Sequence, residues 1–300
     1  MSLFKRVARR LATFGAVAAT ACAGAPAAES VAARPAMWKV ADKDTTIYLF
    51  GTIHLLPPKT QWRSPLFDQA AADADTLVIE TVIDDKNPQA TIGELFKLAV
   101  TPGLPPLAER IPAARRAALD KAIAGSGIPA AAFDRLETWA AAFLLLGGQF
   151  KALGLDAGSG VETALKAQFT AGGKPIGQLE TNAEQFGVFD TLSEQAQRKF
   201  LEGVLEDPTK MKGQFDQMVQ AWTRGDVAGI AKSFNDDLDE SPEMLDALLA
   251  KRNANWTRWV QARLDKPGTV MVAVGAGHLA GDKSVVSLLE KQGLTVTRVQ

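Results

Sequence analysis

The chain has 300 residues, of which 47% are hydrophobic, and its formal net charge at pH 7 is −1. A chain of this length and composition can bury a sizeable core, so its fold does not depend on metals or disulfides for stability. The near-zero net charge gives no electrostatic attraction to nucleic acid or to anionic lipid, and we expect neither as a partner.

The first 28 residues have the order of a secretory signal. Four basic residues lie within the first ten, an apolar stretch follows over 11–23, and small residues surround Ala25-Pro26-Ala27. The apolar stretch is too short for an ordinary membrane span. We therefore expect residues 1–28 to be a signal peptide, and residues 29–300 to be exported as one domain, to the periplasm or out of the cell.

The only cysteine is Cys22, inside this leader. Ala19-Thr20-Ala21-Cys22 resembles a lipoprotein site, but alanine at its first position matches such sites poorly. Membrane anchoring is therefore an alternative only if Cys22 is lipidated. If the leader is removed after Cys22, the mature protein has no thiol for disulfides, nucleophilic catalysis or metal binding.

Short apolar runs, several rich in β-branched residues, predict six strands, which in chain order are 37–40, 45–50, 76–79, 175–179, 269–274 and 294–299. The first two flank the polar turn 41–44 and predict a hairpin. Continuous apolar runs of this kind are typical of strands buried on both faces, as in a parallel sheet.

Helices are predicted between these strands, at 112–124, 129–150, 193–205, 241–266 and 282–292. Ser193 and Ser241 are suitable N-caps, and Pro242 stands at a first helical position. The order of elements predicts an α/β fold with a central, mostly parallel but mixed sheet flanked by helices. A large helical insertion, at about 90–155 and 190–265, belongs to the same single domain.

The chain has only two histidines, and each has glycine three places before it: Gly51 precedes His54, and Gly275 precedes His278. Each motif directly follows a predicted strand, where glycine permits a sharp exit or a close approach. Open α/β sheets bind ligands at the carboxyl ends of their strands. We expect both imidazoles on surface loops at one edge, needed for function but not for folding. The alternative is a histidine that only bonds nearby backbone.

Two glutamates end predicted strands in the same way, Glu80 after 76–79 and Glu180 after 175–179. If the four strands are parallel, two imidazoles and two carboxylates meet at one edge. Such a set suits either a divalent metal with an open position or a general base with its orienting partner. The alternatives are that Glu80 caps a following helix and that Glu180 begins one.

Three further residues are expected near this edge. Arg252 and Asn253 fall within the apolar stripe of the predicted helix 241–266, and a buried arginine requires a carboxylate partner. Arg252 therefore makes a structural ion pair, or it reaches a site glutamate or a substrate carbonyl. Glu162 begins a helix after the glycine-rich stretch Gly158-Ser159-Gly160 and is expected at the same rim.

The chain resembles the TraB/GumN family over residues 38–299. The resemblance lies in an ordered set of short motifs, none of which is specific alone: Leu49-Phe50-Gly51-Thr52-Ile53-His54, Val78-Ile79-Glu80, Gly160-Val161-Glu162, the block 173–181 ending in Leu179-Glu180-Thr181, Arg252-Asn253, and Val274-Gly275-Ala276-Gly277-His278-Leu279. Glu162 departs from the pattern, since aspartate is expected there.

The resemblance implies a fold related to heme-binding ChaN-like proteins and to erythromycin esterases. It also implies kinship with Tiki-type metal-dependent proteases, which use paired Gly-x-x-His motifs with acidic residues. Other relatives are described by genetic context, in peptide-pheromone shutdown or exopolysaccharide clusters.

The leading hypothesis is a metal-dependent hydrolase that acts on a peptide or another small exported substrate. His54, His278 and Glu80 would hold a divalent Mn, Co or Zn ion or activate water, and Glu180 would be a ligand or general base. One alternative is a metal-free esterase with His54 as base, oriented by Glu80. The other is a non-catalytic protein that binds a peptide or heme. A homodimer is compatible with the sequence.

Overall fold

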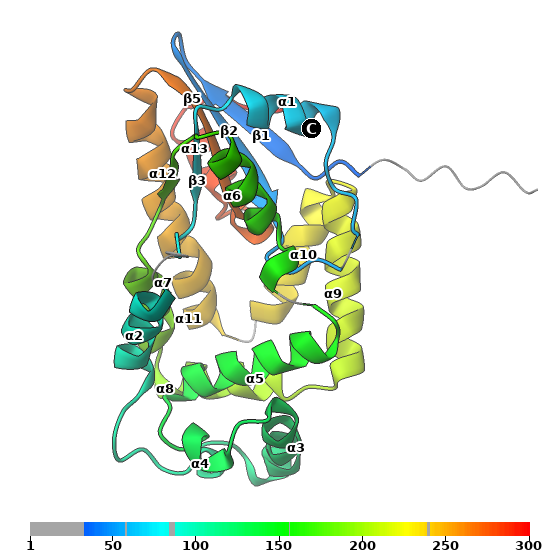
Figure 1. Cartoon of the computed structure of the whole chain (residues 1–300), viewed down its shortest axis with the longest axis vertical. Coiled ribbons are helices and arrows are strands. Elements are labelled where there is room, and N and C mark those ends of the chain that lie inside the picture. Colours follow the sequence, from blue (N-terminus) through cyan, green and yellow to red (C-terminus); the bar gives the residue numbers. More distant parts are fainter. Residues whose placement is uncertain (1–32, 58, 84–87, 156, 239–240) are drawn as a thin grey trace, which may run out of the picture. The chain divides into compact units, whose positions relative to one another are not determined.

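The computed structural model describes residues 33–300 except residues 58, 84–87, 156 and 239–240, and Ala32–Gln300 group into one compact unit (Figure 1). The predicted signal peptide and Cys22 lie outside the described residues. No helix among the described residues is long and apolar enough to cross a membrane.

A six-stranded sheet has the order β4-β3-β5-β2-β1-β6. Figure 1 labels β1, β2, β3 and β5 within it. Four strands run parallel: β4 (Ile176–Gln178), β3 (Thr76–Ile79), β5 (Gly268–Gly275) and β2 (Thr45–Thr52). β1 (Met37–Ala41) forms the predicted hairpin with β2 and is antiparallel to both β2 and the edge strand β6 (Val296–Arg298). The predicted fold, a mostly parallel mixed sheet flanked by helices, is confirmed.

The strand register aligns the carboxyl ends of the parallel strands. Thr52 of β2 pairs with Gly275 of β5, so the two Gly-x-x-His motifs leave the sheet side by side. Ile79 pairs with Ala273 on one side and with Gln178 on the other. The residues that follow β2, β3, β4 and β5 are therefore brought to one edge, as the sequence predicts.

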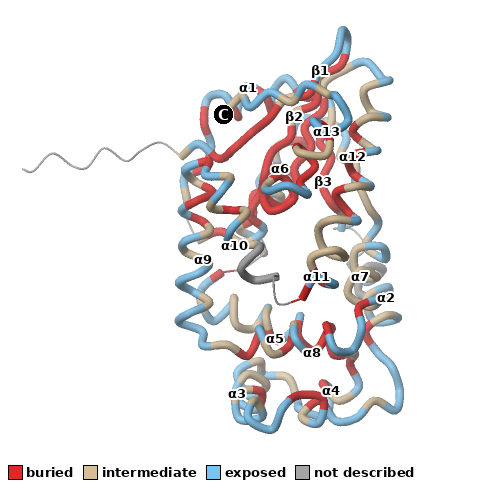
Figure 2. Tube along the Cα trace, turned by 180° about the vertical axis from the view of Figure 1, so that it is seen from behind, coloured by how far each residue is buried: buried red, intermediate tan, exposed pale blue. Residues whose placement is uncertain are grey.

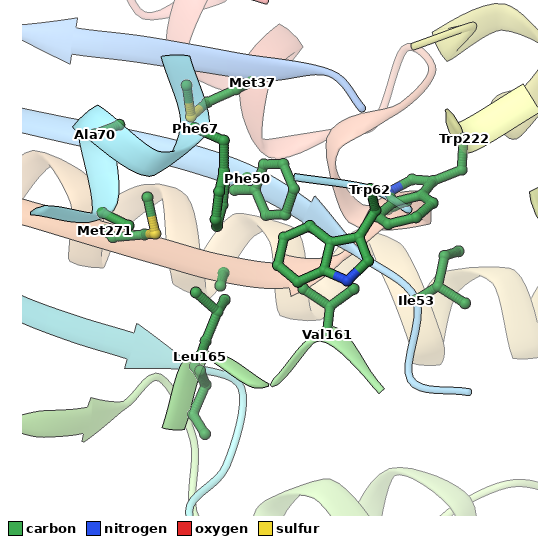
Figure 3. Packing of buried hydrophobic residues seen from close by; sticks show 14 of the residues in the cluster. Met37, Phe50, Ile53, Trp62, Phe67, Ala70, Val161, Leu165, Trp222 and Met271 are labelled. Atoms are coloured by element: carbon green, nitrogen blue, oxygen red, sulfur yellow. The ribbon is translucent and has the colours of Figure 1, made fainter. Parts of the chain in front are cut away.

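Alternation along β2 builds a core on each face of the sheet. Phe50 faces α1 (Pro65–Asp73), α6 (Val161–Ala171) and α9 (Pro208–Thr223), and its ring lies 4.5 Å from that of Phe67 (Figure 3). Leu49 faces the opposite layer. Figure 2 shows that β2 and β3 are buried along most of their length.

The layer on the opposite face consists of α12 (Lys251–Leu264) and α13 (Val285–Lys291). Their buried side chains include Trp256, Val260 and Leu289. The sheet is thus covered by helices on both faces, which leaves the edge at the carboxyl ends of the parallel strands as the place where polar groups collect.

The helical insertion has a core of its own, around the buried Leu119, Phe133, Trp139 and Leu201. Its elements are α2 (Pro88–Ala99), α3 (Arg116–Ser126), α4 (Ala130–Phe133), α5 (Thr138–Ala152) and α8 (Glu194–Val204). The other helices are α7 (Asn182–Asp190), α10 (Val227–Leu238) and α11 (Pro242–Leu245), and a π-helical turn, Asp246–Ala250, joins α11 to α12.

Two predicted helices are interrupted in the structure. The segment 129–150 is divided into α4 and α5 because the buried Arg110 binds the backbone between them, donating to the carbonyls of Leu136 at 2.6 Å and Asp134 at 3.0 Å. The helix predicted from Ser241 is capped by that serine but contains the π-helical turn. Single π turns of this kind often lie at functional sites.

Two other predicted helix boundaries are shifted. The helix predicted at 112–124 begins with a 3₁₀ turn, Ala113–Arg115, and continues as α3 to Ser126. The last helix begins at Val285 rather than 282, because Ser284 caps it by accepting from the backbone N–H of Ser287.

Candidate functional site

The two motif glycines allow close approach at the edge of the sheet. A Cβ at Gly51 would lie 3.1 Å from the Cα of Ala276, so glycine lets the second motif pack against the first. A Cβ at Gly275 would lie 3.2 Å from Glu80 Oε1 and 3.5 Å from His54 Nε2. The absence of a side chain at Gly275 therefore keeps the space between His54 and Glu80 open.

His54 is held by the first turn of α6. Its Nδ1 lies 2.7 Å from Glu162 Oε1, and the hydroxyl of Thr52 donates to the same carboxylate oxygen. The N–H of Val161 donates to the carbonyl of Ile53 at 3.1 Å. The motif and the helix are thus fixed together, and Glu162 orients the ring so that Nε2 faces Gly275.

The side chain of His54 is 63% exposed, so it is the solvent-facing imidazole of the site. Desolvation opposes its protonation, but the hydrogen bond and negative charge of Glu162 outweigh that effect and raise the pKa of His54 to about 9. His54 is therefore protonated at neutral pH. It must release this proton before it can act as a base or as a ligand.

Close packing against Gly160 fixes the backbone of the same loop. A Cβ at Gly160 would overlap the carbonyl oxygen of His54, so the N-terminus of α6 can approach the loop only because this residue is glycine. The glycine-rich stretch before Glu162 therefore has a steric role in placing the carboxylate beside the imidazole.

His278 lies in a short 3₁₀ turn, Ala276–Leu279, and is only 6% exposed. Its Nδ1 lies 2.6 Å from Asn253 Oδ1. The amide nitrogen of Asn253 donates to the carbonyl of Lys283 at 2.8 Å, which leaves Oδ1 as the acceptor. Nδ1 of His278 therefore bears the hydrogen, and Nε2 accepts from Arg252 Nη1 at 3.0 Å.

Burial of His278 disfavours its charged form and lowers its pKa to about 3. The ring packs 4.3 Å from the ring of Trp256. The expectation that both motif histidines lie at the surface is therefore wrong for His278. It is buried because α12 crosses this edge of the sheet and brings Trp256, Asn253 and Arg252 onto it.

Arg252 links the two site glutamates. Its Nη2 donates to Glu80 Oε2 at 2.6 Å and to Glu180 Oε1 at 2.5 Å, and its Nε donates to Glu180 Oε1 at 3.0 Å. Glu80 Oε1 accepts from the N–H of Gly275 at 2.8 Å. Gln185 Nε2 lies 3.2 Å from Glu80 Oε2 and 3.3 Å from Glu180 Oε1, which joins the two carboxylates from α7.

The pKa values of the two glutamates are shifted in opposite directions. Burial opposes the ionisation of Glu80, but the positive charges of His278 when protonated, Arg252 and His54, with the N–H of Gly275, lower the pKa of Glu80 to about 2. Burial raises the pKa of Glu180 above its ordinary value, although Arg252 opposes this. Arg252 itself has a raised pKa because the two carboxylates outweigh the cost of its burial.

The structure brings together the residues singled out in the sequence, with one changed pairing. His54, Glu80, His278, Glu180 and Arg252 meet at the carboxyl edge of the parallel strands. The carboxylate that orients His54 is Glu162 and not Glu80, which corrects the pairing in the metal-free alternative.

The sequence left two alternatives open, that Glu80 caps a following helix and that Glu180 begins one, and the structure gives a different answer for each. α7 begins directly after Glu180, with Thr181 and Glu184 forming a capping box, so Glu180 borders the helix but binds Arg252. Glu80 caps no described helix, because its two oxygens bind Gly275 N, Arg252 and Gln185. Gln185 was not anticipated, since glutamine in a helix interior gives no sequence signal of its own.

The donors at this edge fit a divalent metal by chemical type. Both imidazoles are held at Nδ1, by Glu162 and by Asn253, which is the usual support for histidine ligands that bind through Nε2. In the described part of the chain, no three His, Cys, Asp or Glu side chains already converge at metal-binding distance. His278 and Glu80 instead contact the guanidinium of Arg252, which an ion would have to displace from His278 Nε2.

Similarity to known proteins is found at the level of a protein family. The family model described as the TraB/PrgY/gumN family matches residues 36–298, which is nearly the whole chain and includes every residue of the site. No curated protein and no solved structure matches the chain.

Proposed function

Because the chain belongs to the TraB/PrgY/gumN family, whose motifs form the edge just described, we propose that it is a hydrolase of peptide bonds or of related amide or ester bonds. The observation that supports this most is the matched support of two imidazoles around one open space. Nδ1 of each ring has an acceptor, and His54 Nε2 and Glu80 Oε1 both face Gly275. A site of this kind can orient and activate a water molecule.

His54 is the residue that meets the substrate, because it alone of the two histidines is exposed. Glu162 stabilises its protonated form, so after accepting a proton from water His54 can return it to the leaving group. This is the acid–base cycle of an imidazole held by a carboxylate. His278, neutral and buried, contributes a fixed lone pair at Nε2 rather than a charge.

Arg252 and the two glutamates supply the electrostatic part of the proposal. A guanidinium bound to two carboxylates leaves a net negative charge of one when both are ionised, and none of the three side chains is more than 11% exposed. Such a surplus favours the entry of a cation. It also favours protonation of Glu180, in keeping with the raised pKa of that residue.

A divalent Mn, Co or Zn ion is part of this proposal, with His54 Nε2, His278 Nε2 and Glu80 Oε1 as the residues that would hold it. Bound there, an ion would lower the pKa of its water toward neutrality. In its absence, His54 paired with Glu162 remains able to serve as a general base. The two forms of the proposal make different predictions for metal content and share the requirement for His54.

The test combines metal analysis with a hydrolysis assay. Purified full-length protein, His54→Ala and His278→Ala are measured by elemental analysis and assayed on a panel of blocked peptides and p-nitrophenyl esters with and without EDTA. Loss of His54 should lower turnover by about 10²-fold or more, as for other acid–base residues. Gln61→Ala, an exposed change in the loop after His54, is the matched control and should retain turnover.

Each outcome decides between the forms. Metal that is present in the wild type and reduced in both histidine variants supports the metal-dependent form. Turnover that resists EDTA and requires His54 supports the His54–Glu162 form. If no compound of the panel is turned over, with or without added Mn, Co or Zn, the hydrolase proposal is wrong and a binding role for peptide or heme takes its place.

A further inference from the structure

The helical hairpin formed by α9 and α10 is joined to both Gly-x-x-His motifs. On α9, Trp222 Nε1 donates to the carbonyl of Gly51 at 2.8 Å. On α10, the ring of Phe234 lies so close to Gly277 that a Cβ there would be 2.9 Å from it. Gly277 directly precedes His278, so the part of the hairpin around Phe234 lies next to the motif that contains His278.

A pocket of about 230 Å³ opens between α9, α10 and the end of α5. Its apolar lining consists of Phe150, Met211, Phe215, Met218 and Phe234. The rings of Phe150 and Phe215 are 6.0 Å apart, and all five side chains are partly exposed rather than buried. The side chain of Phe234 therefore contacts the pocket on one side and the motif that contains His278 on the other.

The remaining lining residues are polar but uncharged: Gln214, Gln217 and Ser233. A charged substrate group would find no opposite charge among these residues, whereas amides at the rim can pair with peptide N–H and C=O groups. A cavity of about 150 Å³ is enough to hold a benzene molecule, so this pocket has room for one large side chain. Methionine in the lining adapts to different apolar shapes.

We infer that this pocket is the substrate-recognition subsite of the proposed hydrolase, and that it takes one large apolar side chain, such as Leu, Met or Phe, of a peptide whose scissile bond lies at His54. Calling the bound peptide a substrate rests on the proposed function. Binding of an apolar side chain in the pocket does not depend on catalysis. Recognition by this subsite selects apolar peptides over acidic or small-residue peptides.

The methionines make the test direct. The chain has six, of which Met211 and Met218 line the pocket while Met37 and Met271 are buried in the sheet core. Full-length protein labelled with ¹³C at the methionine methyl groups is titrated with the N-acetyl amides of Leu, Met, Phe, Ala and Glu. The signals of Met211 and Met218 should shift with the first three amides, and those of Met37 and Met271 should not.

Affinity should follow side-chain size. The leucine amide should bind about tenfold or more tightly than the alanine amide, because each methylene in such a pocket contributes strongly to binding. The glutamate amide should not bind measurably. Equal shifts with all five amides, or shifts confined to methionines outside the pocket, would overturn the inference. Binding of octanoate without binding of the amides would overturn it in favour of an acyl chain.

Two filling variants and one control complete the test. Met211→Trp fills the pocket, and Gln214→Trp covers it from an exposed position on the rim, so at least one variant is expected to fold. Both should reduce binding of the leucine amide by about tenfold or more. Phe96→Trp, on the 56% exposed Phe96 of α2, is the matched aromatic control and should bind like the wild type. Unchanged binding in both folded filling variants would overturn the inference.

Failure of this inference differs from failure of the proposed function. His54→Ala should bind the leucine amide as the wild type does, because the pocket does not include His54. If the leucine amide binds in the pocket but no assay shows hydrolysis, the binding pocket is supported and the hydrolase proposal is wrong. If peptides with Leu, Ala and Glu side chains are hydrolysed equally fast, the hydrolase proposal is supported and the recognition subsite is wrong.

Discussion

The two Gly-x-x-His motifs have the same local sequence pattern and follow neighbouring parallel strands, yet their histidines lie in opposite environments. His54 is largely exposed and is paired with Glu162, which favours its charged form. His278 is buried against Trp256 and Asn253, which favours its neutral form. The difference shows that the end of the strand determines where the imidazole lies, whereas the helix that packs on the imidazole determines its protonation state.

A different helix accounts for the environment of each histidine. α6 meets His54 by its first turn, where Glu162 reaches the ring while the opposite side of the ring stays open to solvent. α12 lies across His278 by its side, so Arg252 and Asn253 cover the ring. Two motifs with one pattern thus provide one proton-exchanging group and one fixed lone pair.

The largest expected effect comes from removing the charge that holds the buried motif. Arg252→Met leaves Glu80 and Glu180 buried without their cation, and breaking a buried ion pair in this way costs about 3–5 kcal/mol. Urea unfolding of the full chain measures this loss. Arg258→Met, an exposed position on the same helix, is the control and should change stability by less than about 0.5 kcal/mol. A similar small effect at Arg252 would contradict the buried network.

A smaller difference is expected between the histidines themselves. His278→Ala removes a buried ring that packs on Trp256 and leaves Asn253 Oδ1 unpaired, at a cost of about 2–4 kcal/mol. At pH 9.5, where the protonated form of His54 contributes little to stability, His54→Ala removes an exposed ring and should cost less than about 1 kcal/mol. Thermal melting of the two variants side by side at this pH provides the measurement. Equal losses would mean that the burial of His278 is not important for folding.

Parts of this comparison could be predicted from the sequence and parts could not. Continuous apolar runs indicated the parallel strands, and position at a strand end placed His54, Glu80, Glu180 and His278 at one edge, which needs only short-range reasoning and sheet geometry. The opposite burial of the two histidines depends on how α6 and α12 cross that edge. No local pattern specifies such a crossing.

The same limit applies to the partners. Arg252 could be expected to pair with a carboxylate because it interrupts an apolar stripe, but the stripe does not tell which one. Glu162 was placed near the rim without its partner, and Gln185 gave no signal. The interruption of 129–150 was missed because the cause, hydrogen bonds from Arg110 to the turn, comes from a residue far along the chain.

Opposite pH dependences are expected for the two histidines. His54 has a folded pKa above its unfolded value near 6.5, so its stabilising contribution is full below pH 6.5 and is lost as the pH rises toward about 9. His278 has a folded pKa near 3, so its contribution is full above pH 6.5 and is lost as the pH falls toward 3. Urea midpoints measured from pH 4 to pH 9.5 should decline on both sides.

The histidine variants distinguish the acid decline of the urea midpoint from the alkaline decline. The alkaline decline should become smaller in His54→Ala, and the acid decline should become smaller in His278→Ala, relative to each variant's own stability near pH 6.5. Glu80 adds to the acid side, because its folded pKa of about 2 is below its ordinary value. An alkaline decline that persists unchanged in His54→Ala would show that the raised pKa has no effect on folding.

The smallest expected effect is a change in the pKa of His54 alone, without a change in the fold. Glu162→Gln keeps the size of the side chain but removes the charge, so the pKa of His54 should fall from about 9 toward the ordinary value near 6.5. Because the chain has only two histidines, ¹⁵N NMR titration of the imidazoles resolves both. His278 should stay neutral above pH 4 in both proteins and is the internal control. A midpoint of His54 that moves by less than one pH unit would mean that Glu162 does not set its charge, and that another group of the site, with Glu80 as the nearest candidate, keeps this imidazole protonated.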